Sequence, residues 1–101
     1  MKFFAISYRP EGTTDEEKAP QKIPEALRAW ELYKEDVFRE LYWRADGKPG
    51  VVLVLEGDSI EDINKALNSL PMVVGGTLAF DVIPVTPYTH FERLFKEEFV
   101  D

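Results

Sequence analysis

The stretch that decides the fold is Phe38-Arg39-Glu40-Leu41-Tyr42-Trp43-Arg44, followed by Asp46-Gly47-Lys48-Pro49-Gly50 and then by Val51-Val52-Leu53-Val54-Leu55. Aromatic and aliphatic runs on both sides of a segment rich in Gly and Pro predict two strands joined by a turn. The second run is apolar throughout, which is typical of a central strand that is covered on both faces.

A strand and a helix are expected on each side of this hairpin. A strand is predicted at residues 2–8 and a helix at 24–36 before it, and a helix opening at 57–59 and a strand at 77–83 after it. The order is therefore strand, helix, strand, strand, helix, strand. This order predicts an α+β, ferredoxin-like βαββαβ fold, in which two helices cover one face of a four-stranded antiparallel sheet.

The first helix is predicted from a stripe of Ile23, Leu27 and Trp30, spaced as on one buried face, with Ala26, Tyr33 and Val37 in the neighbouring row. The prolines at 20 and 24 leave two alternatives for residues 16–23. They form either a kinked helix from about residue 15 or a loop before a helix with Pro24 in its first turn.

The second helix is expected to begin with Asp58 as its cap and to end at Pro71. Its buried stripe is formed by Ile60, Ile63, Leu67 and Leu70.

Alternation along the strands divides the sheet into two faces. The helix side is expected to carry Phe4, Ile6, Tyr8, Leu41, Trp43, Leu78, Phe80 and Val82. The other side then contains Phe3, Phe38, Tyr42 and Ile83, which is too apolar to face water. We expect a homodimer formed sheet to sheet, the dimeric α+β barrel; the alternative is a monomer with an amphipathic open face.

Length and composition bound the remaining possibilities. The 101 residues form one domain, residues 1–101, in which 86–101 is a tail that can cross to the partner subunit and pack Phe91, Leu94 and Phe95 there. Thr89 and Glu92 suggest a capping box at the start of that tail. The net charge of -7 disfavours nucleic acid, and without cysteine no disulfide is possible. No signal peptide or membrane span is predicted, so a cytoplasmic location is expected.

The hairpin strand and the second helix carry a family resemblance. The run from Phe38 to Gly47 has an aromatic-Arg-x-Leu-aromatic-aromatic-Arg strand, and the second helix closes on Leu70-Pro71. This pattern resembles the muconolactone isomerase-like family over residues 14–85. The resemblance implies a small dimeric α+β barrel, often assembled further, with a pocket for a small organic molecule. It also implies cofactor-free proton transfer within an unsaturated lactone, although related barrels host monooxygenases, dehydratases, cyclases and haem enzymes.

Three residues are candidate proton carriers. His90 is the only histidine, and it is either a shuttle at a pocket mouth or a surface residue of the tail. Glu40 and Asp81 are charges within strands. Each is either a buried carboxylate with a raised pKa that acts as acid or base, or a group paired with an arginine or solvated.

Five further residues are candidates for substrate binding. The amphipathic aromatics Tyr8, Trp30, Tyr33 and Trp43 are expected to converge between the first helix and the sheet, either as a pocket wall or as core. Arg39 could hold a ligand carboxylate or form a surface ion pair. One histidine and no cysteine make a metal site improbable, so no metal and no cofactor are expected.

Three functions remain open. The first is a cofactor-free enzyme that catalyses isomerisation, dehydration or cyclisation by proton transfer in a pocket between sheet and helices. The second is a non-catalytic oligomeric module that binds a small ligand or supports assembly. The third is a cofactor-free oxygenase of an electron-rich aromatic substrate.

Overall fold

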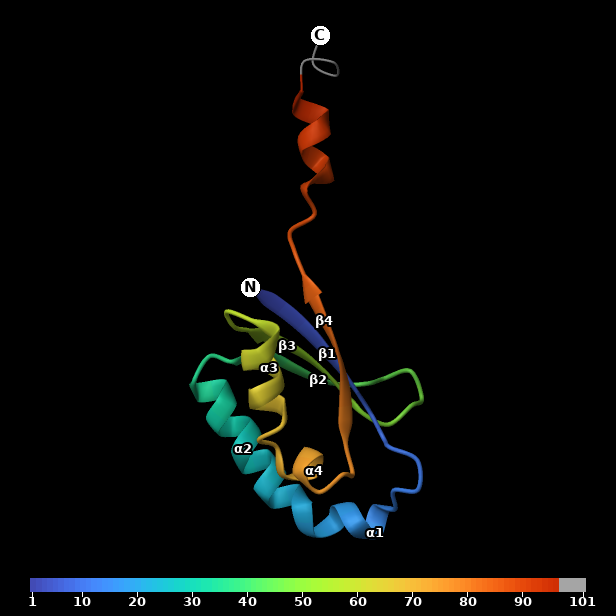
Figure 1. Cartoon of the computed structure of the whole chain (residues 1–101). Helices are drawn as coiled ribbons and strands as arrows, with labels where there is room; N and C mark the ends of the chain where they lie inside the picture. The colour runs from blue at the N-terminus through green and yellow to red at the C-terminus, as the bar shows by residue number, and fades with distance from the viewer. Residues whose placement is uncertain (97–101) are drawn as a thin grey trace.

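The computed structural model describes residues 1–96 and has the predicted order of elements (Figure 1). Its strands are β1 (Lys2–Tyr8), β2 (Phe38–Trp43), β3 (Val51–Glu56) and β4 (Ala79–Val85). They form one antiparallel sheet in the order β2-β3-β1-β4. The predicted ferredoxin-like α+β class is therefore confirmed.

The first crossover contains α1 (Asp15–Lys18), the 3₁₀ turn η1 (Ala19–Gln21) and α2 (Lys22–Lys34). Thr14 begins α1 with a capping box that includes Glu17. Pro24 lies in the first turn of α2, where its missing N–H would have no partner within the helix. Of the two alternatives for residues 16–23, the structure thus has short helical turns that lead directly into α2.

The second crossover contains α3 (Ile60–Leu67) and α4 (Pro71–Val74), and η2 (Thr89–Phe95) follows β4. The cap of α3 is Ser59, whose hydroxyl accepts from the Asp62 N–H, so the expected Asp58 cap is wrong. Pro71 opens α4 instead of ending α3. The capping box expected at Thr89 is also wrong, because no side chain caps η2.

The core lies between the sheet and the helices. Its buried residues come from β1, α2, β2, β3, α3 and the segment before α4: Phe3, Ala5, Leu32, Phe38, Leu53, Leu55, Ile63, Leu67 and Leu70. Phe80 and Val82 of β4 pack against this cluster, as predicted.

The predicted face of β1 is wrong, and that of β2 is wrong at Phe38. In β1 the residues on the helix side are Phe3, Ala5 and Ser7, because Phe3 and Ala5 pair with the core residues Leu55 and Leu53. In β2 the pairing shifts between residues 38 and 40, so Phe38 faces the core although Glu40 faces the other side. Residues 3–6 of β1 are all apolar, so the alternation of polar and apolar residues cannot show which of them face the core.

The predicted buried stripe of α2 is also wrong. Ile23, Leu27 and Trp30 are 81%, 60% and 55% exposed, and the buried residue of α2 is Leu32. The helix is turned so that its half-buried polar residues meet the α3–α4 segment. Arg28 donates to the Ser69 hydroxyl at 2.9 Å, which orients this polar side inward. We call Ile23, Leu27 and Trp30 the outer stripe of α2.

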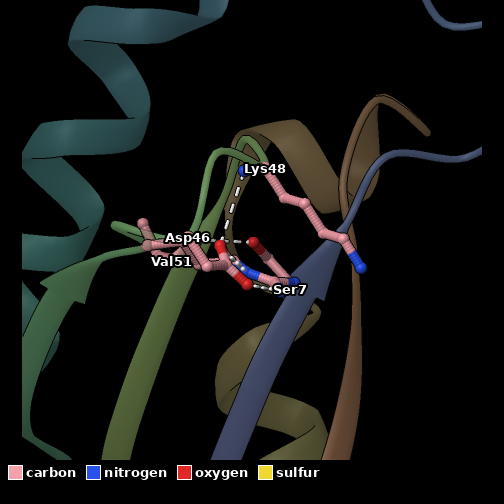
Figure 2. A network of polar contacts seen from close by, with 5 residues as sticks. Ser7, Asp46, Lys48 and Val51 are labelled. Atoms are coloured by element: carbon pink, nitrogen blue, oxygen red, sulfur yellow. Dashed lines mark hydrogen bonds and ion pairs between the residues drawn. The ribbon is translucent and has the colours of Figure 1, made fainter.

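A buried serine hydroxyl links β1 to the start of β3, in addition to the backbone pairing of these two strands. The Val51 N–H donates to Ser7 Oγ at 2.8 Å, and Figure 2 shows these two residues side by side. Gly50 makes the approach possible, because a Cβ at that position would lie 2.7 Å from Ser7 Oγ. Its φ of 133° is a further reason for glycine.

Residues 86–96 extend away from the rest of the chain beyond β4 (Figure 1). Every residue of this segment, which we call the C-terminal arm, is exposed. The rest of the predicted tail, 97–101, lies outside the described residues. Within 1–96, no helix combines the length and the apolar character needed to cross a bilayer.

Candidate functional site on the open face of the sheet

The side of the sheet that no helix covers is apolar at its centre and charged at its edges. We call it the open face. Cross-strand pairing gives its two middle rows: Glu40, Val54, Phe4 and Ile83 form one, and Tyr42, Val52, Ile6 and Asp81 form the other. Val54 is buried and Phe4, Ile6 and Val52 are half-buried. An apolar second face is thus present, as predicted, although partly from other residues than expected.

A hollow of about 310 Å³ lies where the open face meets the β2–β3 hairpin. Ile6 and Val52 form its floor, and the start of the hairpin loop forms its wall with Trp43, Arg44, Ala45 and Asp46. The floor residues belong to the row that ends in Tyr42 on one edge and in Asp81 on the other. An apolar floor with a few polar groups around it is typical of sites for small organic molecules.

Arg44 supplies the positive charge of this hollow. Its guanidinium binds Asp46 in a two-pronged contact, Nη2 to Oδ2 at 2.5 Å and Nε to Oδ1 at 3.1 Å. Asp46 also accepts from the Lys48 N–H, as Figure 2 shows, so the loop holds the carboxylate in place. The bond to Arg44 lowers the pKa of Asp46 to about 2. Three N–H groups of the guanidinium remain for a ligand oxygen.

Tyr42 and Glu40 form a hydrogen-bonded pair on the neighbouring edge. The two residues are two apart on β2 and point to the same face, and the Tyr42 hydroxyl donates to the Glu40 carboxylate. This bond and the nearby negative charge raise the pKa of Tyr42 above its usual value. The hydrogen bond from Tyr42 thus orients the Glu40 carboxylate on the open face.

Asp81 lies at the opposite edge. Three strand spacings separate β2 from β4, so Asp81 is about 14 Å from the Glu40 edge within one chain. Both candidate carboxylates are therefore on the open face, but the chain does not bring them together.

The other predicted site residues are dispersed. Tyr8 pairs with Ala79 on the open face, and Trp43 borders the hollow. Trp30 and Tyr33 stack on each other at 5.7 Å on α2, and both are exposed. The expected convergence of these four aromatics between the first helix and the sheet is absent, because α2 packs Ala29 and Leu32 against the core and leaves Trp30 and Tyr33 exposed.

Arg39 and His90 lie outside the hollow. Arg39 donates from Nε at 2.9 Å to the carbonyl of Asp36, whose φ is 64°. This bond stabilises the turn between α2 and β2. His90 is on the C-terminal arm, where its ring lies 5.8 Å from that of Tyr88.

A second hollow lies between the helix layer and the edge of the sheet. Its volume is about 160 Å³, and it is lined by residues of α3, α4 and β4 together with neighbouring positions: Asn64, Leu67, Asn68, Val73, Ala79, Phe80 and Val82. None of the predicted site residues borders it. It contains no ionisable group, so acid–base chemistry has no carrier there.

Sequence reasoning missed Arg44 and Tyr42 as site residues. The signals were present as Arg44-x-Asp46, the spacing of a bidentate pair across a turn, and Glu40-x-Tyr42, the spacing of neighbours on one strand face. Within residues 1–96, no group of three or more His, Asp or Glu side chains is arranged to hold a metal ion.

The arrangement of the chain has counterparts among solved structures. A 5-chloro-2-hydroxyhydroquinone dehydrochlorinase from Burkholderia phenoliruptrix AC1100, in complex with 2,5-dihydroxybenzoquinone, is similar with a TM-score of 0.68 and 14% identity, over 89% of this chain and 98% of that one. Muconolactone isomerase is similar with a TM-score of 0.63 and 23% identity, over 89% of this chain and 95% of that one. This chain has the muconolactone isomerase fold.

The fold resemblance inferred from the hairpin and the Leu-Pro helix end is therefore confirmed. No family model matches the chain, and no curated protein matches it.

Proposed function

We propose that this chain is a small-molecule enzyme that moves a proton within an oxygen-rich organic substrate on the open face, as a homodimer and without a cofactor. The observation that carries the proposal is the hollow at the hairpin. It has an apolar floor, Arg44 in its wall, and a row of residues that ends in ionisable groups at both edges.

The chemistry follows from these groups. Arg44 would bind a carboxylate or carbonyl oxygen of the substrate and stabilise the negative charge that develops when a neighbouring C–H loses its proton. Glu40 lies outside the lining of the hollow, about 13 Å along β2 from Arg44, so a substrate bound at Arg44 would have to extend along the open face to reach it. There Glu40, oriented by Tyr42, would accept the proton and return it to another carbon, so that the substrate is isomerised and the enzyme is regenerated. Asp81 would be the corresponding group at the other edge.

The fold neighbours support the substrate class. One is named as an isomerase of muconolactone and the other as a dehydrochlorinase of a chlorinated hydroxyhydroquinone. Both names denote small oxygenated organic molecules, which fit the size and polarity of the hollow.

The homodimer is supported by the apolar open face. Phe4, Ile6, Val52 and Val54 form its centre, and contiguous apolar surface of this kind is usually covered by a partner. Two copies packed sheet to sheet would cover these residues and close the hollow from above. Water would then be excluded from the proton transfer, and Asp81 of one copy could approach the Glu40 edge of the other.

Solvent deuterium incorporation tests the proposed reaction. Muconolactone, other unsaturated lactones and hydroxyquinols are incubated with the protein in D₂O, and exchange at carbon is followed by NMR. We expect the wild-type protein to accelerate exchange in at least one compound, and Glu40→Gln to slow it by about 100-fold or more.

Asp58→Asn removes an exposed carboxylate outside the open face and is the matched control, with an unchanged rate expected. If the wild-type protein accelerates exchange in none of these compounds, the enzyme proposal is overturned. A compound that binds at the hollow without exchange would favour the non-catalytic binding module.

A further inference from the structure

The C-terminal arm has a strongly apolar side that none of residues 1–85 covers. Tyr88, Phe91, Leu94 and Phe95 are 60–79% exposed. Phe91 and Leu94 are three residues apart on the 3₁₀ helix η2 and so share one ridge. Tyr88 immediately precedes the helix, and its ring meets that of Phe91 edge to face at 5.0 Å. A helix of two turns is not stable in water without packing. Packing of this apolar side on another surface would therefore stabilise η2.

The arm points away from every apolar surface of its own chain. It leaves the sheet at Val85, opposite Lys2, and continues outward in the direction of β4 (Figure 1). Three extended residues and seven residues of 3₁₀ helix span about 24 Å, all of it directed outward from the sheet. The receiving surface must then belong to another molecule.

The outer stripe of α2 is the matching surface. It is a second apolar helix face on the side away from the core, formed by Ile23, Leu27 and Trp30, with the Tyr33 ring stacked beside the indole. Exposed large apolar side chains at this helical spacing form a stripe that a partner can cover. The open face of the sheet is not needed for this contact, since the proposed dimer covers it.

We propose that the C-terminal arm of one copy packs on the outer stripe of α2 of a second copy. The two surfaces are helical ridges of similar length, three residues across two turns on each, so they can pack ridge to groove. Each copy offers one arm and one stripe. The contact can therefore be reciprocal within a pair, or it can link dimers into a larger closed assembly. It rests on the proposed sheet-to-sheet dimer, which covers the open face, but it does not depend on the proposed reaction.

Intermolecular paramagnetic relaxation tests this contact directly. The chain has no cysteine, so Glu92→Cys gives one spin-label site on the arm, beside Phe91. Unlabelled, spin-labelled E92C protein is mixed in equal amounts with ¹⁵N-labelled wild-type chain, so any signal loss arises between molecules. We expect the amide signals of residues 23–33 to lose more than half of their intensity.

Two controls make the result specific. A spin label at Glu61→Cys, on α3, should leave residues 23–33 unaffected. In the ¹⁵N chain, Leu27→Glu changes an exposed residue, so the spectrum of the sheet should be preserved while the broadening by E92C disappears.

The proposal is overturned if E92C broadens no signals of the second molecule. It is also overturned if the broadened signals are those of the open face, such as Phe4 and Val52, or only those of other arms. The first pattern would make the sheet the receiving surface, and the second would make the arms pair with each other.

Discussion

Replacing Ile6 by glutamate tests whether a second copy covers the open face. Ile6 lies on the central strand β1, between Val52 and Asp81, at the middle of the apolar surface. Full burial of an isoleucine side chain contributes about 1.5–3 kcal/mol, and Ile6 is already half-buried within its own chain, so a partner adds about half of that value. A two-fold interface contains the substitution twice, so the loss is about 1.5–3 kcal/mol before the cost of burying the new charges is added. The dimer dissociation constant should thus rise at least about 10-fold.

Sedimentation velocity over a wide range of protein concentration measures this change. Val74→Glu is the matched control, because it makes the same kind of substitution at an exposed position of α4, and it should leave the dissociation constant unchanged. Circular dichroism establishes that both variants remain folded. The reasoning is refuted if I6E and V74E associate equally well, or if the wild-type protein is monomeric at every concentration.

Three further predictions concern single groups. Ser7→Ala should lower the free energy of unfolding by about 1–3 kcal/mol in urea titrations, because the half-buried Val51 N–H loses its acceptor; an unchanged midpoint would refute that role. Burial raises the pKa of Glu25, so this carboxyl holds a proton more tightly in the folded protein than in the unfolded chain, and the protein should lose stability as pH rises through that pKa. Glu25→Gln should therefore flatten this part of a plot of Tm against pH. A parallel shift of the plot at all pH values would contradict this role of Glu25. Glu40→Leu should lower the pKa of Tyr42 toward the ordinary tyrosine value in an ultraviolet titration, whereas an unchanged titration curve would show that the pair does not form in solution.

The order of elements could be predicted from the sequence because turn residues and apolar runs mark each boundary. The Gly- and Pro-containing turn at 46–50 separates two clear strands, and Pro24 fits the start of a helix. Phe80 and Val82 were assigned to the correct face because β4 alternates with the charged Asp81. These patterns involve residues close together in the chain, so they can be recognised in a single sequence.

The wrong predictions depend on long-range pairing. In β1, the sequence alone does not show whether Phe3 or Phe4 faces the core. The pairing of Phe3 with the core residue Leu55 places Phe3 there. In α2, the larger apolar residues lie outside and the smaller pair of Ala29 and Leu32 lies inside. Periodicity identifies an apolar stripe, but it does not say which of two partners covers that stripe.

The candidate site was predicted in part for the same reason. Glu40 and Asp81 were assigned to the open face from their strands, and that assignment is correct. The hollow itself requires Arg44, fixed by Asp46, to stand beside Ile6 from another strand. The register of the β2–β3 hairpin brings Arg44 and Ile6 together, so this contact cannot be predicted from the sequence of one strand alone.

The most direct test of the central claim is to locate where a small substrate-like molecule binds. Muconolactone is titrated into the ¹⁵N-labelled protein, and the amide shifts are mapped by residue. The account predicts saturable shifts at Ile6, Val52 and the hairpin residues 43–46. Shifts confined to the second hollow, at Asn64, Asn68 and Val73, or no saturable shifts at all would contradict it.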